Sequence, residues 1–307
     1  MNAAQLRSRF ERFVRPRLDK LIVAQDRPVL VMAGGQPGAG KTKMMAAAQW
    51  ETPAAVKVDG DDLRKFHPAY DRVMATDPLR MPLVTAEASS AWVRMSLEYL
   101  RRARASVLME TTMRQPDAVF DTLQTFRDAG YGVEVRVIAV PETLSRLGTL
   151  QRYVGQVESQ GAGRWAPSNV HNEAYTRMPE SLERVVEAGL VDRVIVQKRD
   201  DVTILSAAVV PGDERGSAVA ALAAVEAGRG IDGMTPNQAQ GWLSSMEHTA
   251  RFVADAGVSD PDILNTVAVL RDDILAVAAA AQPFDVDRRA LAAARVQGAV
   301  DRAVRSG

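Results

Sequence analysis

A glycine-rich segment at residues 34–42 constrains the fold of this chain more than any other feature. It follows a continuously apolar run, residues 28–33, which is typical of a strand buried on both faces of a sheet. A helical pattern from Lys41 to about Trp50 comes directly after it. A strand, a glycine turn and a helix in this order predict a loop that binds phosphate at the N-terminus of a helix.

The loop fits the pattern G-x-x-x-x-G-K-[ST] in full, with Gly35, Gln36, Pro37, Gly38, Ala39, Gly40, Lys41 and Thr42. Glycines allow positive φ angles, which let the backbone amides turn inward and form a nest for an anion. We expect Lys41 to contact the β- and γ-phosphates of a nucleotide and the Thr42 hydroxyl to be a ligand of Mg²⁺. The alternative is an ordinary glycine-rich turn, which the flanking strand and helix disfavour.

Further predicted strands follow along the chain and alternate with helical patterns. The strands lie at residues 55–58, 106–109, 133–140 and 193–197, and the helical patterns at 85–104, 117–129, 142–157 and 169–188. Strands that alternate with helices through short turns predict an α/β fold, here a parallel sheet of the P-loop NTPase type wrapped by helices. We expect Pro179 to interrupt the last of these helices.

The character of the sequence changes near residue 208. From there the chain is rich in alanine, with helical patterns at 214–227, 236–255, 260–280 and 286–304 and without strand signals. We therefore predict two parts, a P-loop domain at residues 1–207 and an all-helical C-terminal domain or extension at residues 208–307. Two hypotheses for the second part remain open: a built-in restraint or antitoxin-docking surface, and a part that only stabilises or oligomerises the first.

Composition excludes several classes of function. Lys and Arg total 38 and so do Asp and Glu, so a general binder of nucleic acid or membrane surfaces is not expected. The chain has no cysteine, which excludes thiolate nucleophiles and Cys-ligated metals. Its three histidines, His67, His171 and His248, receive no chemical role.

No apolar run reaches the roughly 20 residues of a membrane span, and charges interrupt the first 24 residues. We therefore expect a soluble cytoplasmic protein without a secretory signal.

Acidic residues end two of the predicted strands. Asp59 and Asp61 follow the predicted strand at residues 55–58, and Glu110 follows the predicted strand at residues 106–109. In an open parallel sheet the carboxyl ends of the strands face the ligand crevice. One aspartate could take the proton of an attacking hydroxyl, and Glu110 could orient metal-bound water or hold a substrate hydroxyl. The alternatives are a helix N-cap followed by a solvated acid, and a capping or surface glutamate.

Two arginines follow later in the chain. Arg152 lies late in a predicted helix, and Arg164 lies in the glycine-rich loop after it. Phosphoryl transfer spreads negative charge over the γ-phosphate oxygens, so cations on a mobile lid stabilise it. Taken alone, Arg152 is typical of a solvated helix residue, whereas Arg164 beside Trp165 favours a role in the site. Trp165 itself is typical of a packing residue.

Several motifs occur in a specific order: the loop 34–42, Val58 to Asp61 with Phe66-His67-Pro68, Leu108 to Arg114, Ala139-Val140-Pro141, Leu147-Gly148-Thr149-Leu150-Gln151-Arg152-Tyr153, and Gly163-Arg164-Trp165. In this order they resemble the zeta toxin family of P-loop kinases over about residues 5–205. One departure concerns Glu110-Thr111-Thr112, where the family usually has Glu-Gly-Thr. A second is Arg94, which stands where the family has an acid. Both departures touch the acceptor side.

The resemblance implies an enzyme that uses ATP and Mg²⁺ to phosphorylate the 3′-hydroxyl of UDP-N-acetylglucosamine and that a cognate antitoxin protein restrains. It implies that Lys41 is the phosphate lysine and that Asp61 is the base on the sugar hydroxyl. Arg152 and Arg164 would stabilise the transferring phosphoryl group. The acceptor would also be contacted by Glu110, Thr112 and Arg114. Glu110 would in addition reach the metal through a water molecule.

Three alternatives remain at this point. Some relatives of the family phosphorylate other acceptors, including NAD. A nucleotide-dependent switch ATPase is the second alternative, because Ser106 to Glu110 is a partial match to an apolar strand that ends in an acid. A binding protein with a vestigial loop is the third, although the intact Lys41 and Thr42 disfavour it.

Overall fold

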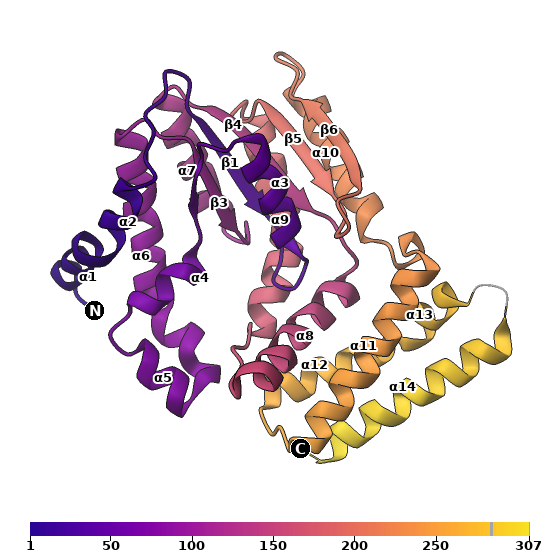
Figure 1. The fold of residues 1–307 in the computed structure, drawn as a ribbon. Helices are drawn as coiled ribbons and strands as arrows, with labels where there is room; N and C mark the ends of the chain where they lie inside the picture. Colours follow the sequence, from indigo (N-terminus) through magenta and orange to yellow (C-terminus); the bar gives the residue numbers. More distant parts are fainter. Residues whose placement is uncertain (283–284, 307) are drawn as a thin grey trace.

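A sheet of six strands forms the centre of the computed structural model, which describes residues 1–282 and 285–306 (Figure 1). The strands lie in the order β2-β3-β1-β4-β5-β6. They span β1 Val29–Gly34, β2 Val56–Val58, β3 Val107–Thr111, β4 Gly132–Ile138, β5 Arg193–Gln197 and β6 Thr203–Ala208. Strands β1 to β5 pair with one another in parallel, which confirms the predicted fold class.

The strand β6 is not predicted by the sequence, and it runs antiparallel to β5. It lies at the edge of the sheet and pairs on one side only. Its side chains are half-buried or exposed, so it lacks the continuous apolar run that identifies a buried strand such as β1. The sheet is therefore mixed, with one antiparallel edge strand.

The two faces of the sheet have separate cores because side chains alternate along each strand. Leu30 and Met32 of β1 face the larger core, while Val31 and Ala33 face a smaller core with Met44. Helix α3, Lys41–Glu51, covers the smaller core. The larger core is covered by α6 Met81–Arg102, α7 Pro116–Asp128, α9 Ser168–Glu187, α10 Glu214–Arg229 and the N-terminal helical segment α1 Ala3–Arg9, η1 Phe10–Val14 and α2 Arg15–Asp19.

Helix α9 is continuous through Pro179, so the predicted interruption is wrong. Proline lacks the amide that would bond to the carbonyl four residues earlier, which belongs to Tyr175. That carbonyl instead accepts a hydrogen bond of 2.6 Å from Arg229 Nη2 of α10. A side chain from a neighbouring helix thus replaces the missing backbone donor.

The C-terminal helices divide between two cores. Ala221 and Val225 of α10 lie in the core of the sheet. A second core joins α8, Glu142–Gln160, to the helices that follow residue 234. These are α11 Pro236–Asp255, α12 Pro261–Asp272, α13 Ile274–Ala281 and α14 Val286–Ser306. The helix expected over 260–280 is therefore two helices, which meet at Asp273.

Figure 1 shows the helices α11–α14 beyond the carboxyl-terminal edge of the sheet, beside α8. The short elements that follow β2 lie near that edge too: α4 Gly60–Leu63, η2 Arg64–Phe66, α5 Tyr70–Thr76 and η3 Pro78–Arg80. Within residues 1–282 and 285–306, no helix combines the length and apolarity needed to cross a bilayer.

Candidate active site

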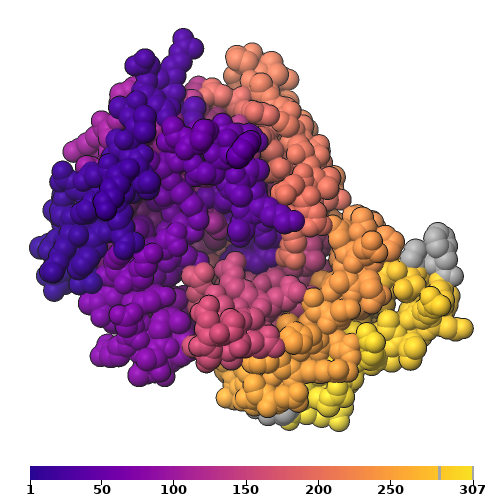
Figure 2. Space-filling model, viewed as in Figure 1, coloured from indigo at the N-terminus to yellow at the C-terminus, as the bar shows by residue number. Residues whose placement is uncertain are grey.

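The candidate site lies at the carboxyl ends of three neighbouring strands. The phosphate loop follows β1, Asp59 follows β2, and Glu110 is the last residue but one of β3. Parallel strands end at the same edge of a sheet, so these residues meet although they are far apart in sequence. Figure 2 shows the molecule hollowed between the purple residues of the N-terminal part and the magenta residues around α8.

The phosphate loop needs glycine at three of its positions. Gly35, Gly38 and Gly40 have φ angles of +150°, +74° and +97°, which L side chains rarely adopt. Gly40 is also the N-cap of α3, so the loop leads directly into the N-terminus of that helix. Free amides and the helix dipole at such a terminus favour an anion.

Lys41 lies buried beneath the loop, with its side chain 8% exposed. Its Nζ donates to the carbonyl oxygens of Gly35 at 2.7 Å and Gln36 at 3.1 Å, and lies 3.6 Å from Glu110 Oε1. Burial lowers the pKa of Lys41, an effect that the charge of Glu110 opposes. The predicted phosphate lysine and the predicted acid of β3 are therefore neighbours.

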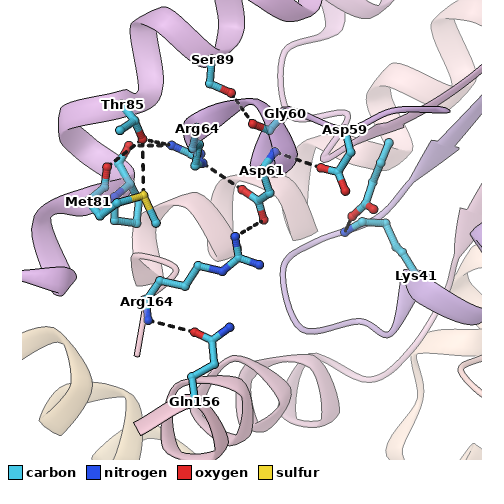
Figure 3. Close-up of polar contacts among 12 residues, drawn as sticks. Lys41, Asp59, Gly60, Asp61, Arg64, Met81, Thr85, Ser89, Gln156 and Arg164 are labelled. Carbon is cyan, nitrogen blue, oxygen red and sulfur yellow. Dashed lines mark hydrogen bonds and ion pairs between the residues drawn. The ribbon is translucent and has the colours of Figure 1, made fainter. Parts of the chain in front are cut away.

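Asp59 and Asp61 have different structural roles. Asp59 Oδ1 accepts a 2.9 Å hydrogen bond from the Asp61 amide, so Asp59 caps α4, as the alternative interpretation of this pair predicts. The Asp61 carboxylate points toward the hollow and lies 2.9 Å from Arg64 Nε and 3.3 Å from Arg164 Nη1 (Figure 3). Burial alone would raise the pKa of Asp61, but the charges of Arg164 and Arg64 outweigh it and lower that pKa.

Arg64 is a site residue that the sequence reasoning missed. Its Nη1 donates to Thr85 Oγ1 at 2.8 Å and to the Pro82 carbonyl oxygen at 2.9 Å, so α6 anchors the guanidinium (Figure 3). The anchored guanidinium then orients Asp61. Asp61 and Arg64 are three residues apart on a short helical segment, and this spacing could have identified Arg64 as a partner of Asp61.

The two predicted arginines differ in their contacts. The amide of Arg164 donates to Gln156 Oε1 at 3.0 Å, which directs its side chain from the end of α8 toward Asp61 (Figure 3). Arg152 is exposed on α8, and among the described residues its side chain has no hydrogen bond or ion pair. Its charge nevertheless contributes to lowering the pKa of both Lys41 and Asp61, so it acts on the same site.

Among the described residues, the side chains of the other predicted residues make no hydrogen bond or ion pair with Lys41, Asp61 or Glu110. Arg114 Nη1 is paired with Glu173 of α9 at 2.5 Å. Thr112 is half-buried after β3, and Thr42 is exposed in the first turn of α3. Thr111, at the position where the family usually has glycine, does not have a positive φ; that conformation falls on Met113, at +51°.

Helix α8 contacts the phosphate loop backbone to backbone. A Cβ added to Gly38 would lie 2.0 Å from the Ser145 carbonyl oxygen, and one added to Gly148 would lie 2.3 Å from the Gly38 carbonyl oxygen. Arg199, after β5, reinforces this contact: its guanidinium donates to the carbonyl oxygens of Gly38, Ala39 and Leu144. The sequence offers no signal for Arg199, because the contact depends on the folded position of the β5–β6 turn.

This contact leads to a first prediction. Gly148→Ala should destabilise the protein by about 1–3 kcal/mol and weaken nucleotide binding, because the new methyl group must displace loop backbone. Gly155→Ala, on the same helix with nothing within 4 Å of its added Cβ, should stabilise the protein by about 1 kcal/mol and leave nucleotide affinity unchanged. Thermal melting and nucleotide titration of the two variants check this prediction. Equal melting temperatures and equal nucleotide affinities of the two variants would contradict it.

The site residues fit a magnesium nucleotide better than a protein-held metal centre. Among residues 1–282 and 285–306, no group of three or more His, Cys, Asp or Glu side chains could hold a metal ion. Mg²⁺ in nucleotide sites takes most of its ligands from phosphate oxygens and water, so few protein ligands are needed. The exposed Thr42 hydroxyl, next to Lys41, suits that arrangement.

Comparison with known proteins places these residues in a family context. The model of the family described as "Zeta toxin" matches residues 17–209. "Toxin zeta" of Streptococcus agalactiae is 27% identical over 209 residues, which cover 67% of this chain and 72% of the relative. "Toxin PezT" of Streptococcus pneumoniae is 28% identical over 175 residues, 56% of this chain and 69% of the relative. A solved structure from the PezAT chromosomal toxin-antitoxin system of that organism has a similar fold, with a TM-score of 0.66 and 22% identity over 79% of this chain and 96% of its own.

Proposed function

The chain belongs to the zeta toxin family, and from this membership and the site geometry we propose that it is a kinase that transfers the terminal phosphate of ATP to a hydroxyl of a small nucleotide-containing acceptor. The acceptor that we propose is UDP-N-acetylglucosamine, phosphorylated at its 3′-hydroxyl. In the cell the protein would act as the toxin of a toxin–antitoxin pair, with an antitoxin protein as its partner. The relatives "Toxin zeta" and "Toxin PezT" support this role.

The first part of the proposal concerns ATP. The amides of residues 35–42 and the Lys41 ammonium group bind the β- and γ-phosphates, and Lys41 exchanges its contacts with the carbonyl oxygens of Gly35 and Gln36 for contacts with the phosphates. When bound to Thr42 and the phosphates, Mg²⁺ would neutralise part of their charge. Glu110, 3.6 Å from Lys41, would orient water on that ion.

The observation that carries the proposal is the Asp61–Arg164 pair. The reaction needs a base for the acceptor hydroxyl and a cation for the transferring phosphoryl group, and these two side chains come from opposite sides of the hollow to within 3.3 Å. Asp61 takes the hydroxyl proton while the oxygen bonds to the γ-phosphorus. The bond from that phosphorus to the bridging β–γ oxygen breaks, and ADP leaves. Arg164 and Arg152 stabilise the charge on the transferring group.

On the acceptor side we propose contacts from Glu110, Thr112 and Arg114. The acceptor would lie between Asp61, Glu110 and the lid, a name that we use for residues 152–164. Arg114 is held by Glu173 at 2.5 Å, so contact with the acceptor requires Arg114 to exchange that partner or to bind beside it.

A screen of acceptors with γ-labelled ATP tests this function. UDP-N-acetylglucosamine, other UDP-sugars, free nucleotides and NAD are offered separately, and the labelled product is identified by mass spectrometry and ³¹P NMR. We expect one phosphate on the 3′-hydroxyl of UDP-N-acetylglucosamine. Label on NAD or on another nucleotide would replace the proposed acceptor, and no label on any of them would remove the proposed reaction.

A second prediction concerns pH. Asp61 must be ionised to accept a proton, and its lowered pKa keeps it ionised below the usual range of aspartate. The activity of the free enzyme, kcat/KM, should therefore fall only when the pH drops through this lowered pKa. Arg164→Gln removes the main charge that lowers the pKa, so the fall should begin at a higher pH. pH–rate profiles of both proteins check this; an acid limb at the same pH in both would contradict it.

A further inference from the structure

One side of α8 is packed into the C-terminal helices. Leu147, Leu150 and Val154 of α8 share the second core with Trp242 and Leu243 of α11. The indole Nε1 of Trp242 also donates to the Thr143 carbonyl oxygen at 3.2 Å, in the first turn of α8. The helix that contacts the phosphate loop through Gly148 is therefore supported from behind by α11.

The loop that carries Arg164 is folded back onto the end of α8. A Cβ added to Gly163 would lie 2.5 Å from the Tyr153 carbonyl oxygen, so glycine permits this close approach. Trp165, two residues after Gly163, is buried, and its ring packs edge to face against the ring of Tyr153. Arg164 thus lies between two residues that are fixed against α8, and its own side chain reaches Asp61.

A single carboxylate of the C-terminal helices binds Trp165 and Ser168, the two ends of the short segment that follows Arg164. Asp262 Oδ2, in the first turn of α12, accepts hydrogen bonds from Trp165 Nε1 at 2.6 Å and from the Ser168 amide at 2.9 Å. Ser168 is the first residue of α9, and its hydroxyl lies 3.0 Å from Thr266 Oγ1. The four residues from Trp165 to Ser168 are therefore tied to α12 immediately after Arg164.

We propose that Asp262 is a positioning residue for Arg164, through which the C-terminal helices fix the direction of the lid arginine toward the reacting phosphate. The inference rests on the proposed kinase function, because Arg164 has its role there. The matched family region ends at residue 209, so Asp262 contributes from a part of the chain that lies outside it.

The electrostatics of Asp262 agree with a fixed, ionised acceptor. Burial would raise its pKa, but the hydrogen bonds from Ser168 and Trp165 outweigh burial and lower it. At neutral pH the carboxylate therefore accepts both bonds without a proton. Charge-assisted hydrogen bonds of this kind are short and directional, which suits a positioning role.

A double-mutant cycle tests the inference. Asp262→Ala should lower kcat about tenfold or more with little change in the KM for ATP, because a displaced Arg164 still permits binding. In an Arg164→Ala background the same substitution should cause no further loss, since the group that it positions is already absent. Asp262→Asn keeps an oxygen acceptor and should retain most of the activity. Losses that multiply in the double variant would overturn the inference.

Limited trypsin digestion provides a readout that needs no acceptor. The bond after Arg164 should be cleaved about fivefold faster or more in Asp262→Ala than in the wild type, because the loop opens more often. Asp272→Ala, an exposed aspartate at the other end of α12, is the matched control and should match the wild type. Equal cleavage in all three proteins would overturn the inference.

The two assays separate this inference from the proposed function. If the wild type transferred no phosphate to any acceptor, the proposed function would fail, and the digestion would still decide whether Asp262 holds the loop. If Asp262→Ala does not fold, Trp165→Phe provides the second variant. It keeps an aromatic ring in the core but removes the indole donor to Asp262, so it should show the same faster cleavage; unchanged cleavage would overturn the inference.

Discussion

Asp61→Asn should bind ATP with near-normal affinity and transfer phosphate about 10²- to 10⁴-fold more slowly. The amide has the shape of the carboxylate and keeps one oxygen, which can still accept the hydrogen bond from Arg64 Nε. It cannot take the proton of an attacking hydroxyl, so the loss falls on the chemical step. Isothermal titration with ATP and single-turnover transfer assays measure the two quantities separately.

Asp62→Asn is the matched control for this experiment. Asp62 is the next residue on the same short helix, but its side chain is exposed. Its replacement should leave both affinity and rate unchanged. A near-normal transfer rate in Asp61→Asn would remove Asp61 from the role of base, and loss of ATP binding would show that its charge is needed for the nucleotide instead.

Lys41→Ala should abolish measurable transfer, a loss of about 10³-fold or more, and weaken ATP binding. The Lys41 ammonium group is the buried cation of the loop, and its loss leaves the β- and γ-phosphates without their nearest point charge. Lys43→Ala removes an exposed lysine two residues further along α3 and should change neither property. ATP titration and transfer assays on both variants check this, and transfer by Lys41→Ala within tenfold of the wild type would contradict it.

The sequence predicts the central parallel strands well because they are buried on both faces. Val31 belongs to a run in which every residue is apolar, and Leu108 lies between Val107 and Met109; such clusters are recognisable without knowledge of the fold. β6 escapes prediction because its side chains are half-buried or exposed, so it has no continuous apolar run. The continuity of α9 escapes because it depends on Arg229, which reaches Tyr175 from a helix more than fifty residues away.

In the candidate site, too, residues in local motifs could be predicted, whereas contacts between distant elements could not. Residues on the loop and at strand ends, such as Lys41, Asp61 and Glu110, could be predicted to meet because parallel strands end at one edge. Arg199 and Asp262 could not, because their partners lie on separate elements and neither belongs to a motif. Arg114 was expected on the acceptor side, and its ion pair with Glu173 depends on where α9 packs.

The packing of the C-terminal helices also decides how their role can be studied. A truncation near residue 208 would remove α10, whose Ala218 and Ala221 are buried in the core of the sheet. It would also expose Leu150 and Trp165, which the later helices cover. Loss of stability would then mask any restraint or docking function, so single substitutions such as Asp262→Ala are the more informative approach.

The central claim is that the phosphate loop binds ATP and directs its terminal phosphate to an acceptor hydroxyl. The most direct measurement follows γ-labelled ATP with and without UDP-N-acetylglucosamine and quantifies labelled acceptor and free phosphate together. We expect one labelled phosphate per acceptor molecule and only slow phosphate release when the acceptor is omitted. Rapid release of phosphate at the same rate with and without acceptor would contradict the claim and indicate a nucleotide-dependent switch ATPase instead.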